Sequence, residues 1–109
     1  MGVTKTDHFT AGHLERALQL KALGHPARLA IVEHLGKVDA CICGDLVDEL
    51  PLSQPTVSRH LRELKDAGLI RGTIEGTSVC YCLDHDALAA LGAFVAGLVP
   101  KRKMKQNCC

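Results

Sequence analysis

Six cysteines are the residues of this sequence whose type and spacing most directly indicate chemistry. They form three close pairs, Cys41/Cys43, Cys80/Cys82 and Cys108/Cys109. The N-terminal residues contain no apolar run of the kind that secretory signals carry, so we expect a cytoplasmic protein with reduced thiols. In a reducing compartment, close cysteine pairs indicate soft-metal ligands or redox-active thiols rather than disulfide staples.

A second group of polar residues shares one face of a helix that we predict between Leu52 and Gly68. At 100° per residue, Val57, Leu61 and Leu64 form an apolar stripe. The opposite side carries Gln54, Ser58, Arg62 and Lys65, with Pro55 and Arg59 at its edge. Ser53 is expected to cap the first turn with its side chain, and Gly68 is expected to end the helix. A helix divided in this way is suited to lie between a protein core and a polyanion.

The elements that must position these two groups follow a recognisable order. We predict helices over residues 10–24, 26–36, 45–50, 53–68 and 84–99, an extended segment over 39–43, and a β-hairpin over 70–83 with its turn at 75–77. The order α-α-β-α-α-β-β-α is that of a winged helix-turn-helix, an α+β fold that is mainly α. We expect one domain over residues 10–99, with a lead at 1–9 and a basic Cys-Cys tail at 100–109.

The last predicted helix is apolar on nearly every side, through Leu88, Leu91, Phe94, Val95, Leu98 and Val99. A domain of this size cannot cover such a helix alone, so we predict a homodimer held by this helix and the first one, with Leu91 in the interface. The apolar run from Ala87 to Val99 is shorter than the roughly 20 residues that cross a bilayer, so we expect no membrane partner.

The composition also excludes several classes of protein. The chain of 109 residues is 47% hydrophobic and 23% charged with a net charge of +1, which is ordinary for a globular domain and excludes a disordered or generally polycationic chain. No Cys-x-x-Cys motif, glycine-rich phosphate loop or βαβ pattern accompanies the thiols. We therefore expect neither an enzyme nor an organic cofactor.

Three stretches of the sequence resemble the ArsR/SmtB family of metal- and metalloid-responsive repressors: residues 22–31, 44–61 and 67–70. The similarity spans residues 14–98, and Ser-Gln-Pro-Thr-Val-Ser-Arg-His-Leu at 53–61 is its most specific part. The resemblance implies a homodimer that binds a palindromic operator in double-stranded DNA and releases it when an inducer binds. The residues expected to contact DNA are Gln54, Pro55, Thr56, Ser58, Arg59 and Arg62. Arg71 and Thr77 of the hairpin are expected to contact the DNA backbone.

The arsenic sensors of this family carry Cys-Val-Cys-Asp-Leu-Cys at the start of the supporting helix, the first of the two helices in the helix-turn-helix. In this sequence that helix is the one predicted at residues 45–50. Residues 41–47 resemble this motif with two departures, because Gly44 precedes Asp45 and Val47 occupies the third cysteine position. Pyramidal As(III) and Sb(III) take three thiolates, which are soft donors for a soft acceptor. We therefore expect As(III) or Sb(III) as the inducer, bound by Cys41 and Cys43 with a third thiol from elsewhere in the dimer.

Two sources of this third thiol are open. The resemblance implies antiparallel C-terminal helices, which would bring the tail with Cys108 and Cys109 near the partner's Cys82. Alternatively, Cys80 and Cys82 supply it, because in winged helices the strand before the supporting helix lies beside the second hairpin strand, and residues i and i+2 of a strand face the same side.

Two other sensing functions also remain open: a sensor of Zn, Cd or Pb, and a thiol-based redox sensor. The family's zinc site between the C-terminal helices is not matched, because Asp86 replaces a histidine, and Gly97 and Pro100 stand where the other ligands belong. We interpret His25, His34 and His60 as helix or packing residues rather than ligands.

Overall fold

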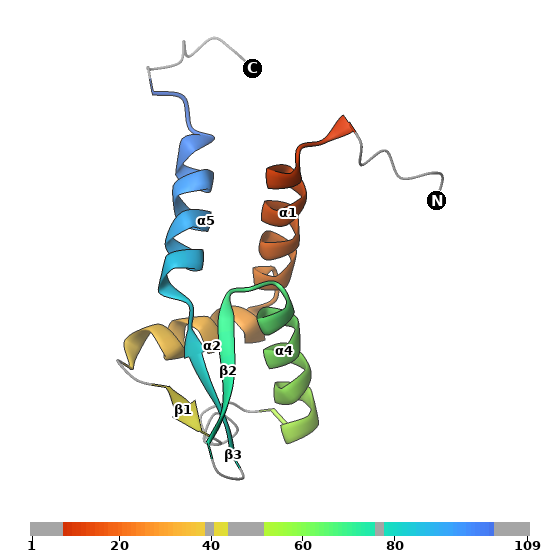
Figure 1. Cartoon of the computed structure of the whole chain (residues 1–109), viewed down its shortest axis with the longest axis vertical. Coiled ribbons are helices and arrows are strands. Elements are labelled where there is room, and N and C mark those ends of the chain that lie inside the picture. Colours follow the sequence, from red (N-terminus) through yellow and green to blue (C-terminus); the bar gives the residue numbers. More distant parts are fainter. Residues whose placement is uncertain (1–7, 39–40, 44–51, 76–77, 102–109) are drawn as a thin grey trace.

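The computed structural model describes residues 8–38, 41–43, 52–75 and 78–101 (Figure 1). Its elements are α1 (Ala11–Leu23), α2 (Pro26–Lys37), β1 (Ile42–Cys43), α4 (Gln54–Asp66), β2 (Ile70–Glu75), β3 (Ser78–Leu83) and α5 (His85–Gly97). This order confirms the winged helix-turn-helix fold that the sequence predicts. The short helix predicted at 45–50 lies outside the described residues, as do Thr77, Cys108 and Cys109.

The first two helices begin where the sequence places them. The side chain of Thr10 accepts a hydrogen bond from the amide of His13 at 3.0 Å and caps α1. At the start of α2, His25 Nδ1 accepts from the amide of Ala27 at 3.0 Å. The predicted end of α2 at Gly36 is one residue too early, because the helix continues to Lys37. Gly36 does not adopt a left-handed backbone, so it does not end the helix.

The ends of α4 show one prediction that is wrong and one that is confirmed. Ser53 has the extended backbone of an N-cap, but its side chain caps no amide and instead lies 3.0 Å from the Thr56 hydroxyl oxygen. At the other end, Gly68 has φ +80°, where an L side chain is strained. The amide of Gly68 donates to the Lys65 carbonyl, and that of Leu69 donates to the Leu64 carbonyl. These two bonds form a Schellman motif that ends the helix.

Three antiparallel strands form a sheet in the order β1-β3-β2. In the hairpin, Ile70 pairs with Leu83 and Glu75 pairs with Ser78. On the other side of β3, Ile42 pairs with Tyr81 and Cys43 pairs with Cys80. The strand before the supporting region therefore lies beside the second hairpin strand, as the fold class predicts (Figure 1).

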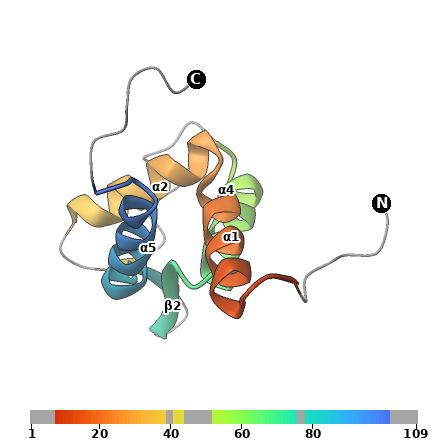
Figure 2. The same cartoon turned by 90° about the horizontal axis from the view of Figure 1, so that it is seen from above.

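The core lies where α2, α4 and the hairpin meet, below α1 and α5 in Figure 1. Figure 2 looks down on α1 and α5, with α2 extending from one towards the other. The core contains Ala22, Ile31, Val32, Leu35, Val57, Leu61, Leu64, Ala67, Leu69, Ile70, Leu83 and Leu91. Leu91 is only 2% exposed, so the prediction that it lies in a subunit interface is wrong: it packs inside its own chain.

Gly68→Ala should lower the free energy of unfolding by roughly 1 to 2 kcal/mol, because a Cβ is disfavoured at a positive φ whatever space surrounds it. Urea unfolding of the two proteins measures this difference. Gly12→Ala is the matched control, since Gly12 lies in α1 with helical backbone and a Cβ there meets only the Thr10 hydroxyl at 3.7 Å. Equal losses in both variants would contradict the role given to the Gly68 backbone.

Candidate nucleic-acid interface and cysteine site

The inner face of α4 fixes how this helix sits on the domain. Val57, Leu61 and Leu64 are all buried, as the 100° periodicity predicts. The helix packs against α1, α2 and β2. On β2, a Cβ at Gly72 would lie 3.6 Å from the Lys65 side chain of α4 and 3.3 Å from the Tyr81 ring of the paired strand β3. The orientation of the outer face is therefore set by the core.

The outer face of α4 is polar, cationic and open to solvent. The exposed residues on it are Pro55, Ser58, Arg59, Arg62 and Lys65, while Thr56 is half-buried and Gln54 is the first residue of the helix. Arg71 on the neighbouring strand β2 is also exposed. Guanidinium groups donate hydrogen bonds to phosphate oxygens and, in pairs, to the O6 and N7 atoms of guanine. This surface can therefore contact both the backbone and the base edges of DNA.

A cluster of three basic side chains joins α2 to the inner side of α4. Arg28 Nε donates to His60 Nδ1 at 3.0 Å, and the rings of His25 and His60 lie 4.5 Å apart between centroids. Burial lowers the pKa of His60 below its ordinary value of 6.5, and the nearby charges of His25 and Arg28 lower it further. The interpretation of His25 and His60 as helix and packing residues is confirmed. The Arg28–His60 bond itself was not predicted, because nothing in the local spacing pairs residues on two separate helices.

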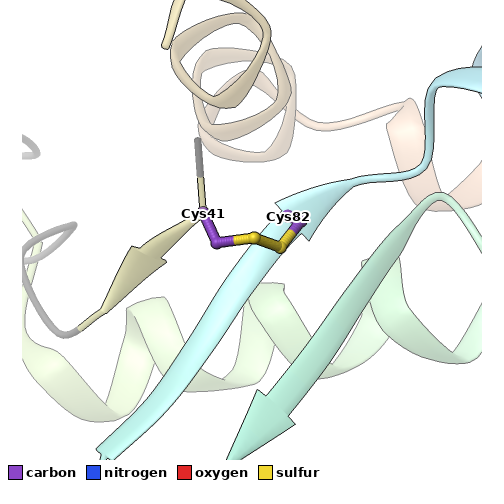
Figure 3. Close-up of a disulfide and its surroundings, with 2 residues drawn as sticks. All are labelled: Cys41 and Cys82. Carbon is purple, nitrogen blue, oxygen red and sulfur yellow. A yellow bond between two sulfur atoms is a disulfide. The ribbon is translucent and has the colours of Figure 1, made fainter. Parts of the chain in front are cut away.

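The structure brings one residue from each of two predicted cysteine pairs into contact. Cys41, just before β1, and Cys82, on β3, form a disulfide between residues 41 positions apart in sequence (Figure 3). Their Cα atoms are 4.4 Å apart. The expectation of reduced thiols is therefore wrong for this pair as the structure shows it. The physical reason is strand pairing, which places the two sulfur atoms within bonding reach.

Cys43 and Cys80 are opposite each other in the same strand pair. Cys80 is fully buried and is itself disulfide-bonded. Of the two arrangements left open by the sequence, the structure thus brings together the strands that carry Cys41/Cys43 and Cys80/Cys82. Within the described residues, no group of three or more His, Cys, Asp or Glu side chains is arranged to hold a metal ion.

None of the helices in the described ranges is both long and apolar enough to cross a membrane.

Comparison with known proteins places this geometry among DNA-binding regulators. A family profile described as "Helix-turn-helix domain" matches residues 23–73. The HTH-type transcriptional repressor SmtB of Mycobacterium tuberculosis is 46% identical over 67 residues, which is 61% of this chain. The chain spans only about half (49%) of that repressor's length.

Two further similarities involve arsenical resistance. The arsenical resistance operon repressor of Staphylococcus xylosus is 38% identical over 69 residues, which cover 63% of this chain and 65% of the repressor. A crystal structure described as a possible transcriptional regulator for arsenical resistance superimposes with a TM-score of 0.64 and 31% identity, over 73% of this chain and 82% of that one. All three similar proteins are transcriptional regulators by name, in agreement with the prediction that this chain is not an enzyme.

Proposed function

Since the chain belongs to the ArsR/SmtB family of helix-turn-helix transcriptional regulators, we propose that it is a repressor that binds operator DNA through α4 and is controlled by its cysteines. The observation that carries the proposal of DNA binding is that α4 has an apolar face and an opposite polar face. Its apolar stripe is buried, and its opposite face presents Ser58, Arg59 and Arg62 to solvent. Exposed Arg71 on β2 extends the cationic surface to the wing of the fold, where it would contact the DNA backbone.

Binding to a palindromic operator requires two copies of the recognition helix related by a two-fold axis. Within the described ranges, most of the exposed large apolar side chains lie on or next to α1 and α5: Phe9, Leu14, Leu18, Leu20, Val95, Leu98 and Val99. Figure 1 shows these two helices at the upper end of the molecule, with α4 at the lower end. This distribution supports a homodimer that uses α1 and α5 and leaves the recognition helix free.

For induction, we propose that reduced Cys41 and Cys43, with a thiol of Cys80/Cys82, bind As(III) or Sb(III). The contact between Cys41 and Cys82 supports this donor set over one that uses the tail, because two soft donors already meet there. The name of the Staphylococcus xylosus relative gives independent support for an arsenical inducer. Bound to three thiolates, the metalloid would supply a crosslink between the two strands.

The location of these cysteines suggests how such a crosslink reaches the dimer. Cys82 is three residues before His85, the first residue of α5, and the amide of Asp84 between them donates to the Leu69 carbonyl at 2.9 Å. Asp84 also caps α5, because its carboxylate accepts from the amide of Ala87 at 3.0 Å. A change in how β1 holds β3 therefore acts directly on the start of a helix that we assign to the subunit interface. A difference of about 3 kcal/mol between two dimer geometries changes DNA occupancy about 150-fold.

A thiol redox sensor is the second candidate function, and the Cys41–Cys82 disulfide is the observation that favours it. Oxidation of the two thiols by a peroxide would form one S–S bond, with both thiol protons and both electrons passing to the peroxide, which becomes two molecules of water. The product is the bond that Figure 3 shows. The same two strands would then be crosslinked without a metalloid.

Combined Arg59→Ala and Arg62→Ala should weaken operator binding and lower the slope of log K against log salt by about 0.9 for every phosphate that the protein no longer neutralises. Fluorescence anisotropy with operator DNA at several salt concentrations measures both effects. Lys37→Ala, which removes an exposed cation from the end of α2, is the matched control and should bind as the unmodified protein does. An unchanged affinity and slope in the double variant would show that α4 does not read the DNA.

Leu18→Asp should weaken dimerisation about a hundredfold, since an unpaired charge in an apolar interface costs about 3 kcal/mol or more. Sedimentation equilibrium measures the dimer dissociation constant. Leu29→Asp on α2 is a close control, because both leucines are 54% exposed in the single chain and only Leu18 lies on the proposed interface. A Leu18→Asp dimer as tight as that of the control would rule out α1 as an interface helix.

Three double variants test the inducer site in fully reduced protein, each with one cysteine pair changed to serine. Arsenite should release operator DNA from the Cys108/Cys109 variant, but not from the Cys41/Cys43 or Cys80/Cys82 variants. Single Cys82→Ser gives the same information without altering buried Cys80. The rate of arsenite capture should fall as pH is lowered, because the attacking group is the thiolate and the thiol has an ordinary pKa near 8.5. The equilibrium affinity should change little below that pKa, because each thiol proton leaves with one hydroxide of As(OH)3 as water.

The outcomes of this experiment separate the candidate functions. A fully responsive Cys41/Cys43 variant contradicts the site, and loss of response in the tail variant moves the third thiol to Cys108/Cys109. Release by Zn, Cd or Pb ions instead of arsenite identifies a metal sensor. Release by hydrogen peroxide alone, abolished by Cys41→Ser and by Cys82→Ser, identifies the redox sensor, and peptide mass spectrometry then shows the loss of two hydrogen atoms.

A further inference from the structure

The buried side of the recognition helix carries one titratable side chain that the proposed function does not use, His60. It is 7% exposed and accepts a hydrogen bond on Nδ1 from Arg28 Nε. Arg28 also donates from Nη1 to the carbonyl of Ala22 at 3.4 Å. One guanidinium on α2 therefore joins the end of α1 to the middle of α4.

This connection requires a neutral imidazole. A neutral histidine has one nitrogen that accepts and one that donates, whereas the imidazolium ion has two donors and no acceptor. Protonation of His60 would set two donors, Arg28 Nε–H and His60 Nδ1–H, against each other at a distance of 3.0 Å. It would also place a positive charge beside His25, whose ring centroid is 4.5 Å away.

The charged groups around this contact do not offset the new charge. From α2, His25 and Arg28 face His60, and on α4 itself Arg59 adds a further positive charge, while Glu63 alone favours protonation. A cavity of about 250 Å³ between α1 and α4 reaches Arg28 and is lined also by Lys21, Glu63 and Asp66. Water therefore has access to the Arg28 side of the contact.

We propose that the Arg28–His60 contact is a positioning device that holds α4 in its DNA-binding orientation, and that mild acid releases it. His60 is in these terms a positioning residue, because it touches no DNA and acts through the orientation of the helix that does. The proposal rests on the proposed reading of DNA by α4. Under this proposal, DNA binding also depends on pH, independently of the state of the cysteines.

The direction of the pH effect follows from the surroundings of His60. Burial, His25, Arg28 and Arg59 lower the pKa of His60 in the folded chain, so the unfolded chain binds more protons between that lowered pKa and 6.5. The hydrogen bond is therefore fully stabilising above pH 6.5, and its stabilisation declines as the pH falls from 6.5 through the lowered pKa. The resulting fall in operator affinity is at most about tenfold per subunit for each pH unit, because one proton binds per imidazole.

Operator affinity measured from about pH 8 to about pH 5.5 tests the proposal, with His60→Asn as the main comparison. The asparagine oxygen stands close to the place of Nδ1, accepts from Arg28 and does not titrate. As the pH falls through the lowered pKa of His60, the unmodified protein should lose affinity relative to this variant. His60→Leu, which removes the acceptor, should bind more weakly than the asparagine variant at every pH. His34→Asn, which removes a histidine at the other end of α2, should follow the unmodified protein.

A second measurement keeps the test independent of the DNA and of the variants' folding. Histidine ring proton resonances in the free, unmodified protein report the titration of His60, which should lie below pH 6.5 and move upwards in Arg28→Met. Identical pH profiles for the unmodified protein and His60→Asn, or titration of His60 at or above 6.5, would overturn the proposal. If α4 does not read DNA, the Arg59→Ala/Arg62→Ala double variant will bind operator DNA as the unmodified protein does. The resonance titration still tests the Arg28–His60 hydrogen bond in that case.

Discussion

The structure depends on the burial of one apolar stripe, formed by Val57, Leu61 and Leu64 of α4. A helix of this length is marginal in water, so its stability comes from packing rather than from propensity. Each of these side chains contributes about 1.5 to 3 kcal/mol when it leaves water. The same packing fixes the rotation of the helix about its own axis. Because that rotation decides which side chains face outwards, core packing and the surface that we propose contacts DNA are set by a single interaction.

The stripe was predictable because a 3.6-residue period in apolar positions identifies a helix and its buried face together. The Ser53 cap and the place of Leu91 were not. A serine hydroxyl can bond an amide or a neighbouring hydroxyl, and only local geometry decides that Thr56 is its partner. A helix that is apolar on nearly every side, as α5 is, gives no periodicity from which to tell the face that packs on its own chain. Leu91 packs inside, while Val95 and Leu98 stay exposed.

The cysteines show a different limit of sequence reasoning. Their spacing in the sequence groups them into three close pairs. The disulfide in the structure joins one cysteine from each of two pairs, Cys41 and Cys82. Such a contact depends on the order of strands, and here β1 lies beside β3 rather than β2. The winged helix-turn-helix fold predicts this neighbour relation, and with it the proximity of the strands that carry Cys41/Cys43 and Cys80/Cys82. The oxidised state was not predicted, because it depends on how closely two paired strands bring particular sulfur atoms.

The cysteine site and the Arg28–His60 hydrogen bond act on the fold at different places, and this separation has a consequence for regulation. The disulfide joins β1 to β3, and β3 leads within three residues into α5, whereas Arg28 joins α2 to the inner face of α4. If the chain dimerises through α1 and α5 as we propose, a change at the cysteines would alter the geometry between subunits through the start of α5. Under our proposal, protonation of His60 would alter the orientation of α4 and, because Arg28 also donates to the Ala22 carbonyl, would act on the end of α1 as well. Since DNA binding by the proposed dimer requires both a correct spacing of two helices and a correct orientation of each, either input alone should weaken it, and a departure of the two effects on affinity from a simple product measures the coupling through α1.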